Sequence, residues 1–253
     1  MQFIDSHSHI DFPEFDSDRI DAIIRAEKAG IKKIIVSATT EQRWDLIRVL
    51  ADDNQIIAAA YGLHPMFTGE HRISHLDKLK TFISEHDTIA IGEIGLDYFI
   101  SNPDHNAQLD LFIQQLDIAT EFNLPVIIHA RKSLDIILRE LRKRPIIKGS
   151  IHSFSGSEQQ ARQLIDLGFY LGFGGPITYT RATKLRRLVS TLPLESILLE
   201  TDSPDQPDLN HFGKRNEPAF LVNMAYEVAK LRGIEMDDLA EQIFNNTKQL
   251  FKL

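Results

Sequence analysis

Histidine, glutamate and aspartate residues end six short apolar segments that lie far apart in the sequence. These residues are His7, His9, His64, Glu93, His129, His152 and Asp202. The chain has no cysteine, so any metal would be held by imidazole and carboxylate groups, a ligand set more typical of catalytic than of structural sites. If these side chains meet, they predict a hydrolytic site with one or two divalent cations such as Zn²⁺, Mn²⁺ or Mg²⁺.

The pair formed by His7 and His9 is weak evidence by itself. Ten histidines in 253 residues would give ~0.4 such pairs by chance. Alternation along a strand places both residues on one face, with Asp5 one layer deeper. A hydrogen-bonded side chain in the core is the more common explanation for any one of these residues. For the seven residues together a shared site is the better explanation, because strand ends selected by packing alone would carry apolar or small residues.

Eight short apolar segments, separated by amphipathic ones, would position these residues. The apolar segments are 3–9, 33–38, 56–64, 88–95, 125–130, 147–154, 169–175 and 196–202. The segments between them carry apolar residues at helical spacing. Eight strands that alternate with helices predict a TIM-type (β/α)8 barrel. Active sites of this fold are built at the C-terminal ends of the strands, where the predicted ligands lie.

The composition favours one domain over residues 1–253, since 43% of the residues are hydrophobic and barrels of this length commonly form one core. Two extra helices, 217–233 and 236–251, are expected after the barrel. A doubly wound open sheet is the alternative, but no glycine-rich loop follows the first strand. The glycines at 172–175 lack the dinucleotide-binding spacing and predict close backbone packing at a strand end.

Charge and hydropathy limit the expected partners and location. A net charge of -8 argues against coating of nucleic acid by electrostatics alone, although bound cations can attract a polyanion locally. No run of 18 apolar residues and no signal-like start occur, so we expect a cytoplasmic protein that does not bind membranes. No obligate protein partner is inferred.

Seven motifs, spread over nearly the whole chain, resemble those of a known family. They are FIDSHSHID, GLHP, IGEIGLDY, PVIIHARKS, HSFSGS, ETDSP and GKRNEP. With these motifs the sequence resembles the TatD-type metal-dependent deoxyribonucleases, a branch of the amidohydrolase superfamily. The resemblance implies a 3′–5′ exonuclease-like deoxyribonuclease with two divalent metal ions and DNA or a small phosphoester as substrate.

The resemblance also implies the roles of individual residues. One metal would be held by His7, His9, Glu93 and Asp202. The second would be held by Glu93, His129 and His152, so that Glu93 bridges the two. His64 matches a family histidine that contacts the substrate phosphate. Asp205 and Phe212 stand where many members carry an aromatic residue and an arginine, as in a less-characterised subgroup with different substrate handling.

The expected reaction is attack of a water on phosphorus. Two divalent cations would lower the pKa of a bound water, with Asp202 beside it as general base. The carboxylates of Glu93 and Asp202 would neutralise only two of the four positive charges of the two cations, so the pocket would attract phosphate. His64 would offset negative charge on the phosphate oxygens. The predicted catalytic residues are therefore Asp202, Glu93 and His64.

Residues around the expected ligands receive supporting roles. Asp5, Glu200 and Asp97 are expected to orient imidazoles or water. The residues predicted to contact a nucleotide backbone are Arg131, Lys132, Lys214 and Arg215. The aromatic residues placed to stack on a base are Tyr98, Phe99 and Phe154. Arg181 begins a helical segment whose basic face is expected to meet solvent, although Arg181 itself could reach the mouth. The histidines expected to be solvated are His71, His75, His86, His105 and His211.

Two other readings remain open. An enzyme of the same superfamily could hydrolyse an amide or a lactone, but such enzymes often bridge their metals with a carboxylated lysine at the end of strand four, and no lysine lies in the segment 88–97. A non-catalytic metal-binding barrel is the alternative of another class. Buried carboxylates without a metal or partner are costly, which disfavours a barrel that has lost its cations.

Overall fold

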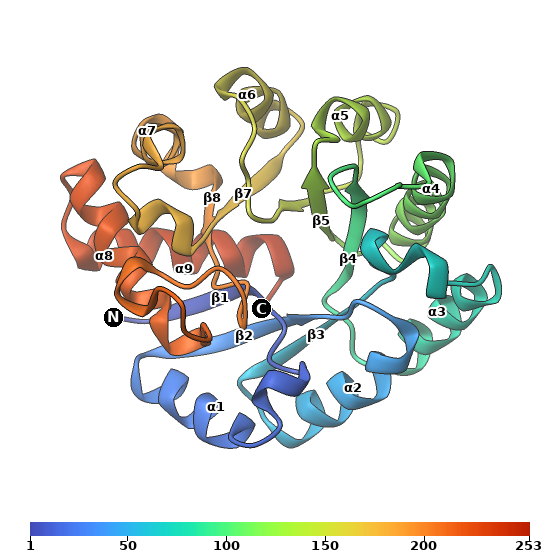
Figure 1. Ribbon diagram of the computed structural model, residues 1–253, viewed down its shortest axis with the longest axis horizontal. Coiled ribbons are helices and arrows are strands. Elements are labelled where there is room, and N and C mark those ends of the chain that lie inside the picture. The colour runs from blue at the N-terminus through green and yellow to red at the C-terminus, as the bar shows by residue number, and fades with distance from the viewer.

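Eight parallel strands form the centre of the molecule, with neighbours in sequence order (Figure 1). The computed structural model describes residues 1–253. The strands are β1 (Phe3–Ser8), β2 (Ile31–Ser37), β3 (Ile57–Tyr61), β4 (Ala90–Asp97), β5 (Val126–Arg131), β6 (Gly149–Ile151), β7 (Phe169–Phe173) and β8 (Ile197–Leu199). Parallel strands need crossover connections, and helices supply them here.

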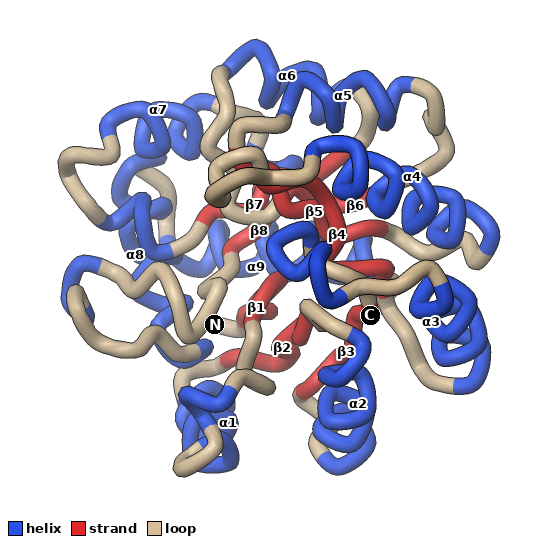
Figure 2. Tube along the Cα trace, turned by 45° about the vertical axis from the view of Figure 1, so that its right-hand side comes forward, coloured by secondary structure: helices blue, strands red, loops and turns tan.

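Helices surround the strands on the outside (Figure 2). The helices of the repeat are α1 (Arg19–Lys28), α2 (Trp44–Asp53), α3 (Ser74–Glu85), α4 (His105–Glu121), α5 (Leu134–Arg142), α6 (Glu158–Asp166) and α7 (Thr183–Thr191). Two more follow β8, α8 (Leu221–Arg232) and α9 (Met236–Phe251). The predicted TIM-type barrel with extra C-terminal helices is therefore confirmed. No helix is both long and apolar enough to cross a membrane.

The barrel closes between β1 and β8 without a regular ladder of hydrogen bonds. The Ser6 hydroxyl donates to the Leu199 carbonyl (3.0 Å), and the Asp202 amide donates to the His7 carbonyl (3.0 Å). The His9 amide donates to the Ser203 carbonyl (2.7 Å). This irregular seam brings the end of β8 against the end of β1, so Asp202 lies next to the first two histidines.

Apolar side chains close the other end of the barrel. A separate cluster of nine buried residues combines strand residues such as Ile4, Ile35 and Ala60 with Leu250 and Phe251 from the end of α9. A larger cluster of 55 buried residues packs the strands against the helices. Polar groups inside the barrel are therefore displaced toward the C-terminal ends of the strands, as expected for this fold.

Three strands end three residues earlier than the sequence predicts. The predicted strands 56–64, 147–154 and 196–202 shrink to Ile57–Tyr61, Gly149–Ile151 and Ile197–Leu199. The residues beyond them follow irregular backbone, in which Ser153 and Asp202 have positive φ values of 45° and 55°. His64, His152 and Asp202 are thus carried by loops that turn over the mouth of the barrel.

Glycines at the end of β7 and just after it allow the close packing that the sequence predicts. A Cβ atom on Gly172 would overlap the Glu200 carboxylate, and one on Gly175 would overlap the Gln206 carbonyl. Gly172 and Gly175 therefore let Glu200 and the loop after β8 approach the end of β7 and the backbone that follows it.

Candidate metal centre

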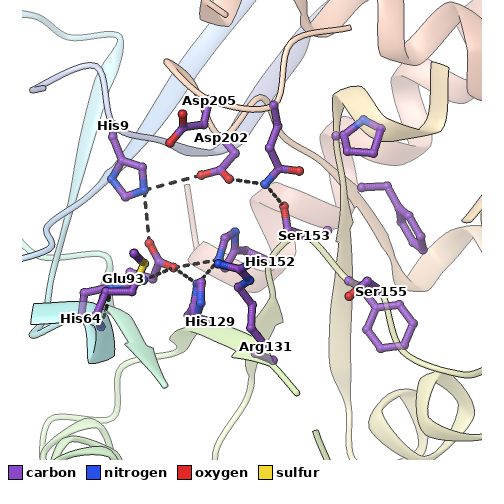
Figure 3. Close-up of a pocket in the computed structure, with 18 of the residues that line it drawn as sticks. His9, His64, Glu93, His129, Arg131, His152, Ser153, Ser155, Asp202 and Asp205 are labelled. Carbon is purple, nitrogen blue, oxygen red and sulfur yellow. Dashed lines mark hydrogen bonds and ion pairs between the residues drawn. The ribbon is translucent and has the colours of Figure 1, made fainter. Parts of the chain in front are cut away.

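Glu93 lies at the centre of a cluster of imidazoles (Figure 3). It is 1% exposed. Its Oε2 atom is 3.2 Å from Nε2 of His7 and 3.2 Å from Nε2 of His9. Its Oε1 atom is 2.8 Å from Nδ1 of His129 and 2.7 Å from Nε2 of His152. One carboxylate is therefore shared between two pairs of histidines that lie far apart in the sequence.

Asp202 completes the group around His7 and His9. Its Oδ1 atom is 3.5 Å from Nε2 of His7 and 3.6 Å from Nε2 of His9, and those two nitrogens are 3.2 Å apart. On the other side, Nδ1 of His129 is 3.0 Å from Nε2 of His152. Ligand atoms at about 2.0–2.2 Å from one cation stand roughly 3.0–3.5 Å apart. Both groups have the spacing of ligands around a cation.

The protonation of the ring nitrogens supports the same conclusion. Nδ1 of His9 faces the Ser37 carbonyl at 2.9 Å, and Nε2 of His129 faces the Asp97 carboxylate at 3.0 Å. Both partners only accept hydrogen bonds, so the proton of each neutral imidazole sits on that outer nitrogen. The inner nitrogens then direct lone pairs at the cluster, which is the arrangement of metal-ligating histidine. The residues therefore fit divalent cations.

Ser37 at the end of β2 contacts both His7 in β1 and His9 just after it. Its carbonyl faces His9, and its hydroxyl lies 3.1 Å from Nδ1 of His7. Strands β2 and β7 contribute no predicted ligand. The structure shows that β2 supplies this outer contact, while β7 supplies the glycines that make room for Glu200.

His64 differs from the other histidines of the cluster. Its Nδ1 accepts a hydrogen bond from the Met66 amide (3.2 Å), so its neutral ring carries the proton on Nε2, which lies 2.9 Å from Oε1 of Glu93. Burial lowers the pKa of His64 to about 4 despite the attraction of Glu93. His64 is therefore a neutral donor that points at the cluster, although its position beside Glu93 and His129 also matches a ligand group.

The electrostatics of the cluster favour a bound cation. Burial disfavours charge on Glu93, but the imidazoles of His152, His64 and His7 hold the pKa of its carboxyl well below the usual range. Burial likewise disfavours charge on His7, but Glu93 and Asp202 raise the pKa of His7 well above its usual value. Glu93 is thus ionised at neutral pH, and its surroundings attract positive charge.

The three acidic residues expected to orient the ligands make different contacts. Asp97 accepts from His129, as expected. Asp5 accepts from the amide and hydroxyl of Thr201 and contacts no imidazole, so it joins β1 to the residues after β8 instead of orienting a ligand. Glu200 accepts from the Ser153 amide, and its Oε1 is 3.8 Å from Nδ1 of His152. Burial raises the pKa of Asp5 to about 7 and that of Glu200 to about 8.

Replacing Asp97 by alanine should weaken metal binding and activity without removing a ligand. Loss of an outer partner of a ligating histidine typically costs about 10–100-fold in metal affinity or activity. We expect Asp97→Ala to fall in that range when metal affinity is measured by competition with a chelator. Asp5→Ala is the comparison, because Asp5 contacts no imidazole. An equal loss of metal affinity in both variants would contradict the assigned role of Asp97.

A cavity of about 630 Å³ opens from the cluster to the surface. It is lined by His9, His64, Glu93, His129, His152 and Asp202, together with Arg131. Arg131 is 45% exposed and lies 3.4 Å from the Asp97 carboxylate. Its guanidinium therefore reaches the mouth of the cavity, and its contact with substrate stays a prediction.

The other three residues predicted to contact a nucleotide backbone, Lys132, Lys214 and Arg215, do not line this cavity. Arg215 donates to both oxygens of the Asp18 carboxylate (2.6 and 2.8 Å) and lies over the Phe15 ring. Lys214 beside it is exposed. The GKRNEP motif instead fixes the loop after β8, since Asn216 donates to the carbonyls of Thr201 and Asp205. Arg215 is engaged by an acidic partner that the sequence pattern does not reveal.

Two further sets of expected residues need correction. Tyr98 stacks on His105, Phe154 is 2% exposed, and the Phe99 ring has Arg131 and Lys132 beside it. The rings of Tyr98 and Phe154 are thus covered, whereas Phe99 remains 56% exposed. Among the histidines expected to be solvated, His75 is buried and His71 is half-buried, with Nε2 of His71 2.9 Å from the His64 carbonyl.

Gln206 is a site residue that the sequence analysis missed. Its side-chain amide donates to Oδ2 of Asp202 and to the hydroxyl of Ser153 (2.6 Å). It thereby links the loop after β8 to the loop after β6 and leaves Oδ1 of Asp202 facing the histidines. No sequence signal marks it, because a glutamine in a polar loop has no characteristic spacing.

A buried cluster of imidazoles and carboxylates at the C-terminal end of a (β/α)8 barrel defines a metal-dependent hydrolase with an amidohydrolase-like fold. Comparison with known proteins agrees. The chain is 40% identical over 256 residues to the metal-dependent hydrolase YjjV of Escherichia coli K12, covering 100% of this chain and 98% of YjjV. A metal-dependent hydrolase of Haemophilus influenzae is 36% identical over 265 residues, covering 99% and 100% of the two chains.

The solved structure of YjjV, described as a TatD homolog, superposes with a TM-score of 0.95 at 38% identity and covers 99% of this chain and 98% of its own. A family model described as TatD related DNase matches residues 4–252. The chain belongs to this family, which confirms the resemblance found in its motifs.

Proposed function

We propose that the protein hydrolyses phosphodiester bonds of DNA, in a 3′–5′ exonuclease-like manner, with two divalent cations that share Glu93. The observation that carries the proposal is the division of the Glu93 carboxylate, with Oε2 toward His7 and His9 and Oε1 toward His129 and His152. A single cation would need only one of these groups. The family model, described as TatD related DNase, supports the choice of substrate.

The cations, when bound, supply Lewis acidity and lower the pKa of water. Asp202 is placed to accept the proton of the attacking water. Burial disfavours its charge, but its contact with His7 holds the pKa of Asp202 at about 2, so the carboxylate is ionised at neutral pH. Gln206 holds its Oδ2 atom, which fixes the side chain at the edge of the cavity.

His64 and Arg131 are placed to bind the phosphate. The Nε2 proton of His64 points into the cluster and can donate to a non-bridging oxygen, where charge develops during attack. Arg131 lines the same cavity with its cationic head at the mouth, where contacts of this kind position a nucleic acid backbone. No lysine lies on β4, which disfavours an enzyme for amides or lactones that relies on a carboxylated lysine.

Metal removal tests this proposal. We expect the protein to cleave end-labelled single-stranded DNA after reconstitution with Mn²⁺, and chelation to abolish cleavage and lower Tm, because a ligand that binds only the folded state stabilises it. Restoring Mn²⁺ should restore both. Lactones and cyclic amides are the comparison substrates. Hydrolysis of these with no cleavage of DNA or of a simple phosphodiester would contradict the proposal.

A further inference from the structure

A second cavity lies beside the metal pocket and shares walls with it. It measures about 280 Å³ and is lined in part by Tyr179, Arg181 and Phe212. Pro176 and Gln206 line both cavities. Since Gln206 also donates to Asp202, one side chain separates the second cavity from the predicted general base. A molecule whose scissile bond lies at the cluster would meet this cavity directly.

The second cavity has a rigid aromatic corner. The rings of Tyr179 and Phe212 lie 6.2 Å apart with an interplanar angle of 76°. The Tyr179 hydroxyl donates to the Pro207 carbonyl (3.0 Å), which fixes its ring against the loop after β8. Phe212 is 70% exposed. Large exposed aromatic faces beside an active site are the type of surface on which unpaired bases stack.

Arg181 adds an uncommitted positive charge to this corner. Its guanidinium lies 5.4 Å from the centre of the Tyr179 ring. Arg181 is exposed and has no carboxylate within ion-pair distance, whereas Arg187 on α7 lies 3.7 Å from Glu158. A phosphate could therefore be bound by Arg181 without breaking an existing ion pair.

We propose that Tyr179, Arg181 and Phe212 form a subsite for a nucleotide next to the scissile phosphate, with the base on the aromatic corner and its phosphate on Arg181. This subsite rests on the proposed hydrolysis of DNA and specifies its substrate as a strand with unpaired bases. Neither ring can reach the face of a base that remains stacked in a duplex.

Substrate comparison with matched variants tests the subsite. In Phe212→Ala, we expect KM for a single-stranded oligothymidylate to rise about ten-fold, as loss of one base-stacking contact predicts. In Arg181→Ala, which removes the phosphate contact, we expect KM for the same substrate to rise and its salt dependence to weaken. Hydrolysis of methyl p-nitrophenyl phosphate, which has no second nucleotide, should be unchanged. Phe212→Trp should retain the wild-type KM. Tyr226→Ala and Arg187→Ala remove an exposed ring and an exposed charge elsewhere and should change neither substrate.

The outcomes separate the subsite from the reaction. Equal effects on both substrates, or no effect on either, would overturn the subsite while phosphodiester hydrolysis stands. A wild-type protein that hydrolyses only the small diester would also overturn it. A wild-type protein that hydrolyses neither would refute the proposed function. Anisotropy of labelled oligothymidylate then decides the subsite, because a Kd unchanged in Phe212→Ala overturns it without reference to cleavage.

Discussion

Glu93→Gln should reduce kcat/KM for DNA cleavage by about 10³-fold or more and release at least one bound cation. Loss of an outer partner of a ligand typically costs about 10–100-fold, and Glu93 contacts both groups of imidazoles directly. The amide is nearly isosteric but carries no charge and offers one acceptor oxygen, so it cannot serve both groups. Metal content per chain and steady-state kinetics measure the two effects.

Glu140→Gln is the matched control for Glu93→Gln. Glu140 on α5 is another buried glutamate, 2% exposed, that pairs with Arg139 on the same helix and with Lys143 just after it, and it does not line the cavity. It should retain full metal content and activity even if its stability falls. A Glu93→Gln protein that keeps both cations would show that this carboxylate does not hold them.

His64→Gln should lower kcat by about 10²–10³-fold, the usual effect of losing one donor to a developing negative charge, and leave the metal content unchanged. The reason is the tautomer of His64. The Met66 amide occupies Nδ1, so Nε2 carries a proton and cannot act as a ligand while that proton remains. Elemental analysis and kinetics on the same preparation distinguish a donor from a ligand.

His75→Gln provides the comparison for this variant, because His75 is a buried histidine that does not line the metal pocket. It should keep wild-type metal content and kcat. If His64→Gln loses a cation together with activity, then His64 belongs to the ligand group with Glu93 and His129, and the assignment of His64 as a donor is wrong.

The sequence predicts the barrel and the composition of the cluster because both depend on periodic features. Alternation of short apolar and amphipathic segments indicates the strands and helices, and the fold itself gathers strand ends at one mouth. Glu93 and His129 lie within their strands and follow this rule directly. His64, His152 and Asp202 lie beyond theirs, yet the loops that carry them still turn inward.

Other features could not be predicted because they depend on contacts between distant loops. Arg215 belongs to the GKRNEP motif, but its orientation is decided by Asp18 beside α1. Gln206 and Ser37 each act through two hydrogen bonds that leave no sequence pattern. The tautomer of His64 depends on one backbone amide. These contacts can be recognised only in the three-dimensional structure, whereas the types of the ligand residues follow from the sequence at the strand ends.

The sharing of Glu93 between two cations is tested most directly by a crystal structure of the Mn²⁺-loaded protein with anomalous data collected near the manganese edge. We expect two anomalous peaks about 3.5–4 Å apart, one beside His7 and His9 and the other beside His129 and His152, with one oxygen of Glu93 bound to each. A single peak, or two peaks with Glu93 bound to only one of them, would contradict this assignment.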